Sequence, residues 1–309
     1  MRLFFKRIGF ILLVFIGVSS AISYGSLWSL RQGSFYKPSF LEHIQTSEFD
    51  YIVLGSSTGL TTLNTQVIDS VSGMHGLNLS MDDTSLSSQY LMLQHFIASG
   101  KQTPVCILAA SILDYDVTDN VLSGNDYRFL PYVSRAYVSD YYRSFSGSSA
   151  RISAYSNWFP VLGMGYYNVE LFYPSLVSLV QPQKRNRFDA YGNYSYPITT
   201  NVSELIVSRR SKTLQLNNPY FKKIQDLCAK HDMALVVYIP PHKTLAVEMG
   251  STSFSIINHS DLLHDTKYFY DDVHVNRLGR QAVSLRFRDV FSIHSNLPNT
   301  RTDAVLDAF

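Results

Sequence analysis

Apolar and polar positions alternate along this chain in a pattern that predicts strands separated by helices. Apolar runs of strand length, most of them closed by a glycine or a polar residue, occur at 50–54, 76–80, 105–110 and 234–239. Apolar residues recur at helical spacing over 84–99, 219–231 and 277–291. This alternation predicts the α/β class, with a doubly wound, mostly parallel sheet.

A longer apolar segment precedes the first strand. Residues 8–30 carry no charge and are numerous enough to cross a bilayer as one helix. Basic residues before this segment favour a cytoplasmic N-terminus and a domain outside the cytoplasm. A cleaved signal peptide, giving a secreted protein, is the alternative because small residues lie between Val18 and Ala21. We expect an uncleaved single-pass anchor in the cytoplasmic (inner) membrane, since apolar character continues to Leu30.

The same pattern divides the chain into three parts. Residues 1–30 form a cytoplasmic tip and transmembrane anchor, residues 31–48 a polar stalk, and residues 49–309 the α/β domain. Within that domain, the segment at about 115–211 breaks the alternation and is rich in Tyr, Ser, Asn and Gly. We interpret this segment as an insertion that caps the site and not as a second independent domain.

Charge and cysteine content exclude several classes of function. The net charge is +2, and three basic residues of the N-terminal tip account for that excess, so no nucleic-acid-binding surface is expected. Cys106 and Cys228 fall in apolar runs and are expected to be buried thiols rather than a disulfide framework. Their spacing matches no zinc pattern, and we expect neither a metal nor a cofactor.

Two distant motifs can together form a Ser-His-Asp triad. The first strand ends at Gly55 and turns directly to Ser57, which would expose its hydroxyl and place its backbone N–H as an oxyanion donor. Near the other end, Asp271 stands three residues before His274 on a loop that enters a helix. Asp271 would orient the imidazole, while His274 takes the proton from Ser57.

Each motif also has a simpler interpretation. Ser57 alone could cap a helix, and Asp271 with His274 could be surface residues at the start of a helix. The order of the motifs and their strand context favour the triad when they are taken together. Asn276 and Gly279 would shape the turn after His274.

The serine and histidine motifs resemble those of the SGNH/GDSL hydrolase superfamily. Ser57 stands at the nucleophile position of its first block and Asp271-x-x-His274 matches its last. In the second block, Asn78 is present and Asp83 replaces the usual glycine; in the third, Leu113 stands where an Asn donor is usual. The resemblance implies an SGNH/flavodoxin-like sheet, with Asn78, Asp83 and His242 in the oxyanion or substrate-binding region.

The pattern looks like that of the divergent, membrane-anchored branch of the superfamily. That branch includes bacterial polysaccharide O-acetyltransferases and the D-alanine transfer protein of teichoic acid modification. The resemblance implies an acyltransferase, with acetyl as the expected group and an envelope or secreted polysaccharide as acceptor. A polytopic membrane protein is the expected acyl donor. An esterase or deacetylase with the same triad, and a non-catalytic glycan-binding or assembly factor, are the alternatives.

Overall fold

The computed structural model describes residues 1–119, 121–199, 203–250 and 254–295, which form two compact units. The first unit combines residues 1–44 with residues 124–186, and the second combines residues 45–123 with residues 187–309. The polypeptide therefore passes from the first unit to the second, back to the first, and again to the second.

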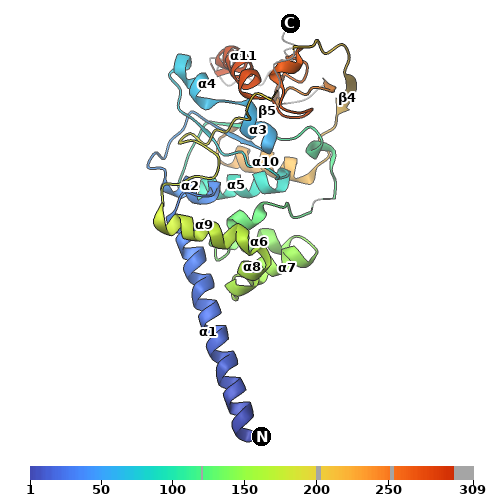
Figure 1. The fold of residues 1–309 in the computed structure, drawn as a ribbon. Coiled ribbons are helices and arrows are strands. Elements are labelled where there is room, and N and C mark those ends of the chain that lie inside the picture. Colours follow the sequence, from blue (N-terminus) through green and yellow to red (C-terminus); the bar gives the residue numbers. More distant parts are fainter. Residues whose placement is uncertain (120, 200–202, 251–253, 296–309) are drawn as a thin grey trace. The chain divides into compact units, whose positions relative to one another are not determined.

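The first unit is helical, and its longest element is α1. Its elements are α1 (Arg2–Gln32), α2 (Lys37–His43), the 3₁₀ helix η2 (Asp126–Tyr132), α6 (Ala136–Arg143), α7 (Ser148–Tyr155), α8 (Pro160–Tyr167) and α9 (Val169–Val180). Helix α9 packs across the C-terminal end of α1 (Figure 1). Among the described residues, α1 is the helix long and apolar enough to cross a membrane. An N-terminal helix of this kind could be a membrane anchor or a signal sequence.

Residues 31–48 differ from the polar stalk expected from the sequence. Helix α1 continues to Gln32, and α2 follows with Pro38 near its start. Phe40 and Leu41 of α2 are buried within the first unit. Four apolar or aromatic side chains at 35, 36, 40 and 41 can be buried together, which outweighs the polar composition around them.

The expected insertion at about 115–211 is divided between the two units. Residues 124–186 pack with the N-terminal residues, while residues 187–211 return to the second unit. The part that belongs to the first unit, residues 124–186, is therefore shorter at both ends than the predicted insertion. That this segment covers the site stays a prediction.

The second unit contains a five-stranded parallel sheet. Its strands are β1 (Tyr51–Gly55), β2 (Gly76–Asn78), β3 (Val105–Ala109), β5 (Ala234–Ile239) and β7 (Ser255–Asn258). They lie in the order β2-β1-β3-β5-β7, and each pairs with its neighbour in parallel. The four strands predicted from apolar runs are confirmed. Strand β7 was not predicted, because it is short and ends in Asn258 without a buried apolar run.

Helices surround this sheet, and the predicted ones are confirmed with small shifts of their ends. They are α3 (Ser57–Thr62), α4 (Thr65–Ser72), α5 (Leu86–Ala98), α10 (Pro219–Lys230) and α11 (Arg277–Ser295), with 3₁₀ turns η1 (Asp114–Asp116) and η3 (Thr266–Tyr268). Helix α11 packs on α4, and α10 packs on α5 (Figure 1). A small second sheet pairs β4 (Arg210–Leu214) with β6 (Leu245–Met249) in parallel.

Alternate residues of the strands contribute to different parts of the core. Tyr51 and Val53 of β1 belong to one hydrophobic cluster together with Phe287 of α11. Cys106 of β3 points away from that cluster and forms a hydrogen bond with Cys228 of α10, and this bond and burial raise the pKa of the Cys106 thiol. Both cysteines are free and buried, which confirms the expected burial of these thiols.

A buried histidine predicts that the stability of the second unit depends on pH. His259 is 3% exposed, and its burial, with a smaller effect of Arg286, lowers its pKa to about 4. The unfolded chain takes up this proton near pH 6.5, whereas the folded protein resists it until about pH 4. The free energy of unfolding should therefore fall as the pH decreases from about 6.5 to 4, by about 3 kcal/mol in total.

The variant His259→Phe should reduce this pH dependence, because the substituted ring cannot be protonated. Denaturant unfolding at several pH values between 4 and 7 measures the effect. The exposed His231 provides the matched control, and His231→Phe should keep the slope of the wild-type protein. An unchanged slope in His259→Phe contradicts the assignment.

Candidate active site

Ser57 lies where β1 turns abruptly into α3. Strand β1 ends at Gly55, where an added Cβ would lie 2.2 Å from the carbonyl oxygen of Ala109, so a larger residue does not fit. Ser56 is the N-cap of α3 and Ser57 is its first residue. The buried Ser56 hydroxyl lies 3.0 Å from that of Thr58. This turn leaves the Ser57 side chain only partly buried.

Asp271 and His274 lie on a tight loop before α11. Tyr270 donates its backbone N–H to the carbonyl oxygen of His274 at 2.8 Å, which closes the loop. The carboxylate of Asp271 accepts the backbone N–H of Val273 at 2.8 Å and that of His274 at 2.7 Å. These two backbone hydrogen bonds hold the Asp271 carboxylate in position independently of the His274 ring.

The three predicted residues form a continuous hydrogen-bonded chain. His274 Nδ1 lies 2.8 Å from Asp271 Oδ2, and His274 Nε2 lies 2.7 Å from Ser57 Oγ. A carboxylate only accepts hydrogen bonds, so Nδ1 carries the proton and Nε2 presents its lone pair to the serine hydroxyl. This is the arrangement in which a histidine can remove the proton of a serine nucleophile.

The charge of Asp271 is stabilised in this loop. Burial acts to raise the pKa of this carboxyl group, but hydrogen bonds from the His274 ring and from two backbone N–H groups outweigh it. The pKa of Asp271 therefore lies below its ordinary value. The carboxylate stays ionised and can stabilise the imidazolium formed when His274 accepts a proton.

Asn276 and Gly279 hold the histidine loop against α11. The fully buried Asn276 amide donates to the carbonyl oxygens of Lys267 and Phe269, and its oxygen accepts the N–H of Leu278 and Gly279. At Gly279, an added Cβ would lie 2.3 Å from the carbonyl oxygen of Tyr268. Both residues shape the turn, as the sequence predicted.

A small cavity is lined by sequence neighbours of Ser57 and His274, although Ser57, Asp271 and His274 are not among its lining residues. Its volume is about 60 Å³, and its walls include Thr58, which follows Ser57, and Val273, which precedes His274. The remaining walls come from the turns after β3 and β5: Ser111, Ile112, Leu113, Pro240, Pro241 and His242. The volume is that of a few water molecules, and the mainly apolar walls suit a short acyl chain.

His242 is the predicted substrate-binding residue that lines this cavity. Its Nδ1 accepts the backbone N–H of Thr244 at 3.1 Å, which leaves the ring proton on Nε2. Burial lowers its pKa, with a further lowering from Arg209 that Asp272 opposes. The imidazole is therefore neutral near pH 7, with one N–H that can donate.

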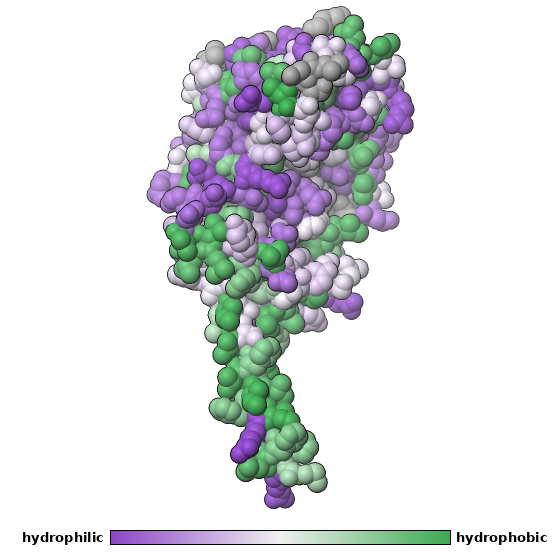
Figure 2. Space-filling view, viewed as in Figure 1, coloured by the Kyte–Doolittle hydropathy of each residue, from purple (hydrophilic) through white to green (hydrophobic). Residues whose placement is uncertain are grey.

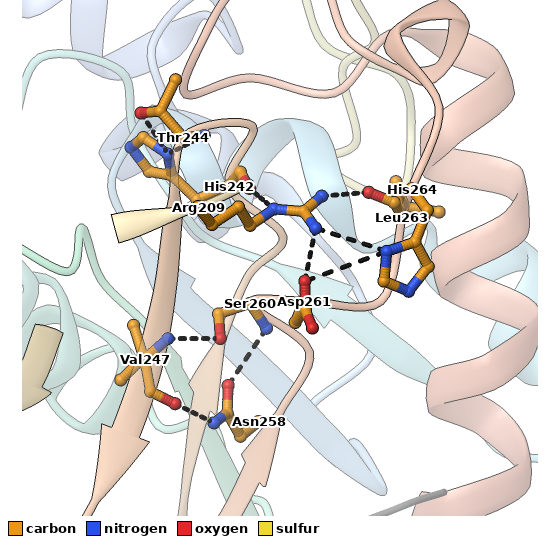
Figure 3. Close-up of polar contacts among 9 residues, drawn as sticks. All are labelled: Arg209, His242, Thr244, Val247, Asn258, Ser260, Asp261, Leu263 and His264. Atoms are coloured by element: carbon orange, nitrogen blue, oxygen red, sulfur yellow. Dashed lines mark hydrogen bonds and ion pairs between the residues drawn. The ribbon is translucent and has the colours of Figure 1, made fainter. Parts of the chain in front are cut away.

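Arg209 connects the loops behind His242 (Figure 3). Its guanidinium donates to the carbonyl oxygen of His242 at 2.9 Å, and also to Asp261 and to the carbonyl oxygen of Leu263. Asn258 and Ser260 form a second group of bonds that fixes β6 through Val247. The basic run at residues 209–212 is typical of a solvated loop, but the Arg209 side chain is only 5% exposed.

Asn78 and Asp83, the other predicted oxyanion residues, do not take part in the hydrogen-bonded chain of Ser57, His274 and Asp271. Asn78 is buried, and its amide donates to the carbonyl oxygens of Gly59 and Leu63, which uses both of its hydrogens. Asp83 is exposed and has a φ of 53°, a conformation that glycine favours. Neither residue lines the cavity. Their oxyanion roles stay predictions, and the bonds of Asn78 favour a structural role.

Two tyrosines beside His274 were not singled out from the sequence. Tyr196 and Tyr270 stack with ring centroids 4.2 Å apart and an angle of 9°, and the Tyr196 ring lies 5.2 Å from that of His274. Tyr270 is 39% exposed. Tyr270 belongs to the histidine motif, so its proximity to His274 could have been predicted from the sequence. Tyr196 is distant in sequence, and it is held there because its carbonyl oxygen accepts the backbone N–H of Arg277.

Comparison of the sequence with known proteins does not assign the chain to a family. No protein-family model matches the chain, and no curated protein matches it.

Proposed function

We propose that the protein is a serine acyltransferase that acylates a cell-envelope or secreted polysaccharide. The observation that carries this proposal is the chain of hydrogen bonds from Asp271 through His274 to Ser57. Ser57 Oγ attacks the carbonyl carbon of the donor, and its proton passes to His274 Nε2 and then to the leaving group. In the second half, the acceptor hydroxyl attacks the acyl-serine, and its proton returns through His274 to Ser57 Oγ.

The sheet topology supports this assignment. Numbered by their own sequence order, the five strands lie in the order 2-1-3-4-5, the order of flavodoxin-like doubly wound sheets. In such sheets, ligands bind beyond the carboxyl ends of the strands where the order reverses. Ser57 follows β1 and the cavity wall Ser111 follows β3, the two strands at that point. An SGNH-like domain is therefore part of the proposal.

The cavity suggests which acyl group is transferred. A space of about 60 Å³ accommodates an acetyl group and excludes long chains. Leu113 adds an apolar wall there and is itself 60% exposed. The N–H of Ser57 and the Nε2–H of His242 are the donors that we assign to the acyl oxygen. We therefore expect the transferred group to be acetyl.

The acceptor is inferred from the tyrosine pair and from α1. Sugar rings stack on accessible aromatic rings; Tyr270 is exposed, and its half-buried partner Tyr196 lies against the histidine that would deprotonate the acceptor. Helix α1 would anchor the protein in the cytoplasmic membrane with the catalytic unit outside the cytoplasm. A polytopic membrane protein would then supply the acyl group.

Ester turnover tests this proposal. The full-length protein in lipid nanodiscs is mixed with nitrophenyl acetate or nitrophenyl hexanoate. We expect acetyl attached to Ser57 by mass spectrometry, and acetyl turnover at least about 10-fold faster than hexanoyl turnover because the cavity is short. Added polysaccharide should divert acetyl from water to the glycan.

The other outcomes separate the alternatives. Rapid hydrolysis that added glycan does not alter indicates an esterase. Absence of any acyl-Ser57 intermediate with a folded protein indicates a non-catalytic factor.

A further inference from the structure

The exposed part of α1 is uncharged from Ile8 onward. No side chain between Arg2 and Ile22 is buried, whereas burial begins at Ser23. At 1.5 Å per residue, the uncharged exposed stretch at residues 8–22 is about 22 Å long, which is shorter than the roughly 30 Å hydrocarbon core of a membrane. A bilayer that α1 crosses would therefore extend to the part of α1 on which the rest of the first unit packs.

Helix α9 is packed closely on this part of α1. The Ser29 hydroxyl donates to the carbonyl oxygen of Ser175 at 2.7 Å. At Gly33, an added Cβ would lie 2.6 Å from Cβ of Ser178. Small residues on both helices let their backbones approach closely, as in helix pairs within membranes. The position of α9 is therefore fixed relative to α1.

The segment that ends with α9 exposes a large apolar surface. Six apolar or aromatic side chains between residues 158 and 180 are more than half exposed: Trp158, Phe159, Val169, Tyr173, Leu179 and Val180. We call these six residues the platform surface. Hydrophobic residues continue from α1 onto the adjoining part of this unit (Figure 2). Exposed apolar side chains that gather in one segment, as these do, are typical of sites that contact a membrane or another protein.

We propose that the platform surface lies in the interfacial zone of the same bilayer that α1 crosses. This proposal rests on the proposed anchoring role of α1. Trp and Tyr are enriched where a membrane meets water, and Trp158 and Tyr173 occur in the unit that surrounds the emerging helix. The Arg143 guanidinium lies 5.3 Å from the centre of the Trp158 ring, where it can also meet lipid phosphates.

Lipid is the favoured occupant because the surface is continuous with α1. Tyr24, an exposed residue of α1, donates its hydroxyl to the carbonyl oxygen of Trp158 at 3.4 Å, so this end of the platform surface touches the helix. An apolar surface joined to a membrane-spanning helix must meet the same lipid unless another protein covers it. The first unit thus holds the protein at the membrane surface through α1 and the platform surface together.

The tryptophans of the chain allow a direct test. The chain contains two, Trp28 on α1 and Trp158 on the platform surface, so Trp28→Phe leaves Trp158 as the sole emitter. The full-length variant is placed in nanodiscs of ordinary or brominated phosphatidylcholine. Bromine near the headgroup end of the acyl chains should quench the fluorescence of Trp158 at least about twofold, because its ring lies at that depth.

A matched pair of double variants provides the control. In the Trp28→Phe protein, Leu179→Asp with Val180→Asp should reduce this quenching, because carboxylates draw α9 away from the lipid. Leu205→Asp with Val207→Asp makes the same changes at exposed residues of the second unit and should leave quenching unchanged.

Two results overturn the proposal. Quenching of Trp28 in the Trp158→Phe protein, without quenching of Trp158, shows that α1 is inserted but the platform surface is away from lipid, as a protein partner would require. Quenching of neither tryptophan shows that α1 does not enter the bilayer. Neither result depends on acyl transfer, so the proposed catalytic function is judged separately.

Discussion

Replacing Ser57 by alanine should lower acyl transfer by about 10⁴-fold or more. The substitution removes the atom that forms the covalent intermediate, and His274 Nε2 loses the hydroxyl 2.7 Å away. The loss should appear in kcat with ester substrates and in the acyl content of the polysaccharide in cells. The side chain is small and partly exposed, so the variant should unfold at the same denaturant concentration as the wild-type protein.

The residues of a triad act as one unit, and this provides the control. His274→Ala should cause a similar loss, and the double variant should be hardly worse than either single variant. Ser56→Ala is the matched serine control: its hydroxyl contacts Thr58 rather than His274, so the effect should be small. Full activity of a folded Ser57→Ala protein would falsify the acyl-serine mechanism.

Replacing Asp271 by asparagine should lower kcat by about 10⁴-fold with little change in structure. The asparagine oxygen can still accept the backbone N–H groups of Val273 and His274, so the loop is kept. Its amide nitrogen, however, would donate to Nδ1 and force the ring proton onto Nε2. That nitrogen could then no longer accept the proton of Ser57.

The neighbouring carboxylate gives a matched comparison. Asp272 is exposed and pairs with Lys243 at 3.3 Å, and Asp272→Asn should retain most of the activity. Equal losses in both variants contradict a specific role for Asp271 and indicate a general effect of charge on the loop. Kinetics with a small activated ester and denaturant unfolding of both variants decide between these results.

The sequence was sufficient to predict the main strands and the three residues of the hydrogen-bonded chain. Ser57 follows a buried apolar strand, and Asp271 and His274 are close together in one loop, so local rules place each motif. Parallel strands then bring their carboxyl ends to one edge of the sheet, where distant motifs meet. These inferences need only residue spacing and strand direction.

Other parts of the site depend on contacts that spacing does not encode. Arg209 lies in a basic run typical of a solvated loop, yet it is buried by carbonyl oxygens from two other loops. The stacking of Tyr196 on Tyr270 brings together residues with no common motif. Likewise, the two hydrogen bonds of the Asn78 amide depend on where the fold places the carbonyl oxygens of Gly59 and Leu63, which residue spacing does not specify.

Ser57 and His274 are 217 residues apart in sequence, so they leave the ribosome at different times. Ser57 is therefore made well before His274 and before helix α11, which follows the histidine loop. A nascent or prematurely terminated chain therefore displays a serine with ordinary reactivity. Under the proposed acyl-serine mechanism, a chain that stops before His274 has no base for Ser57 and should not consume an acyl donor.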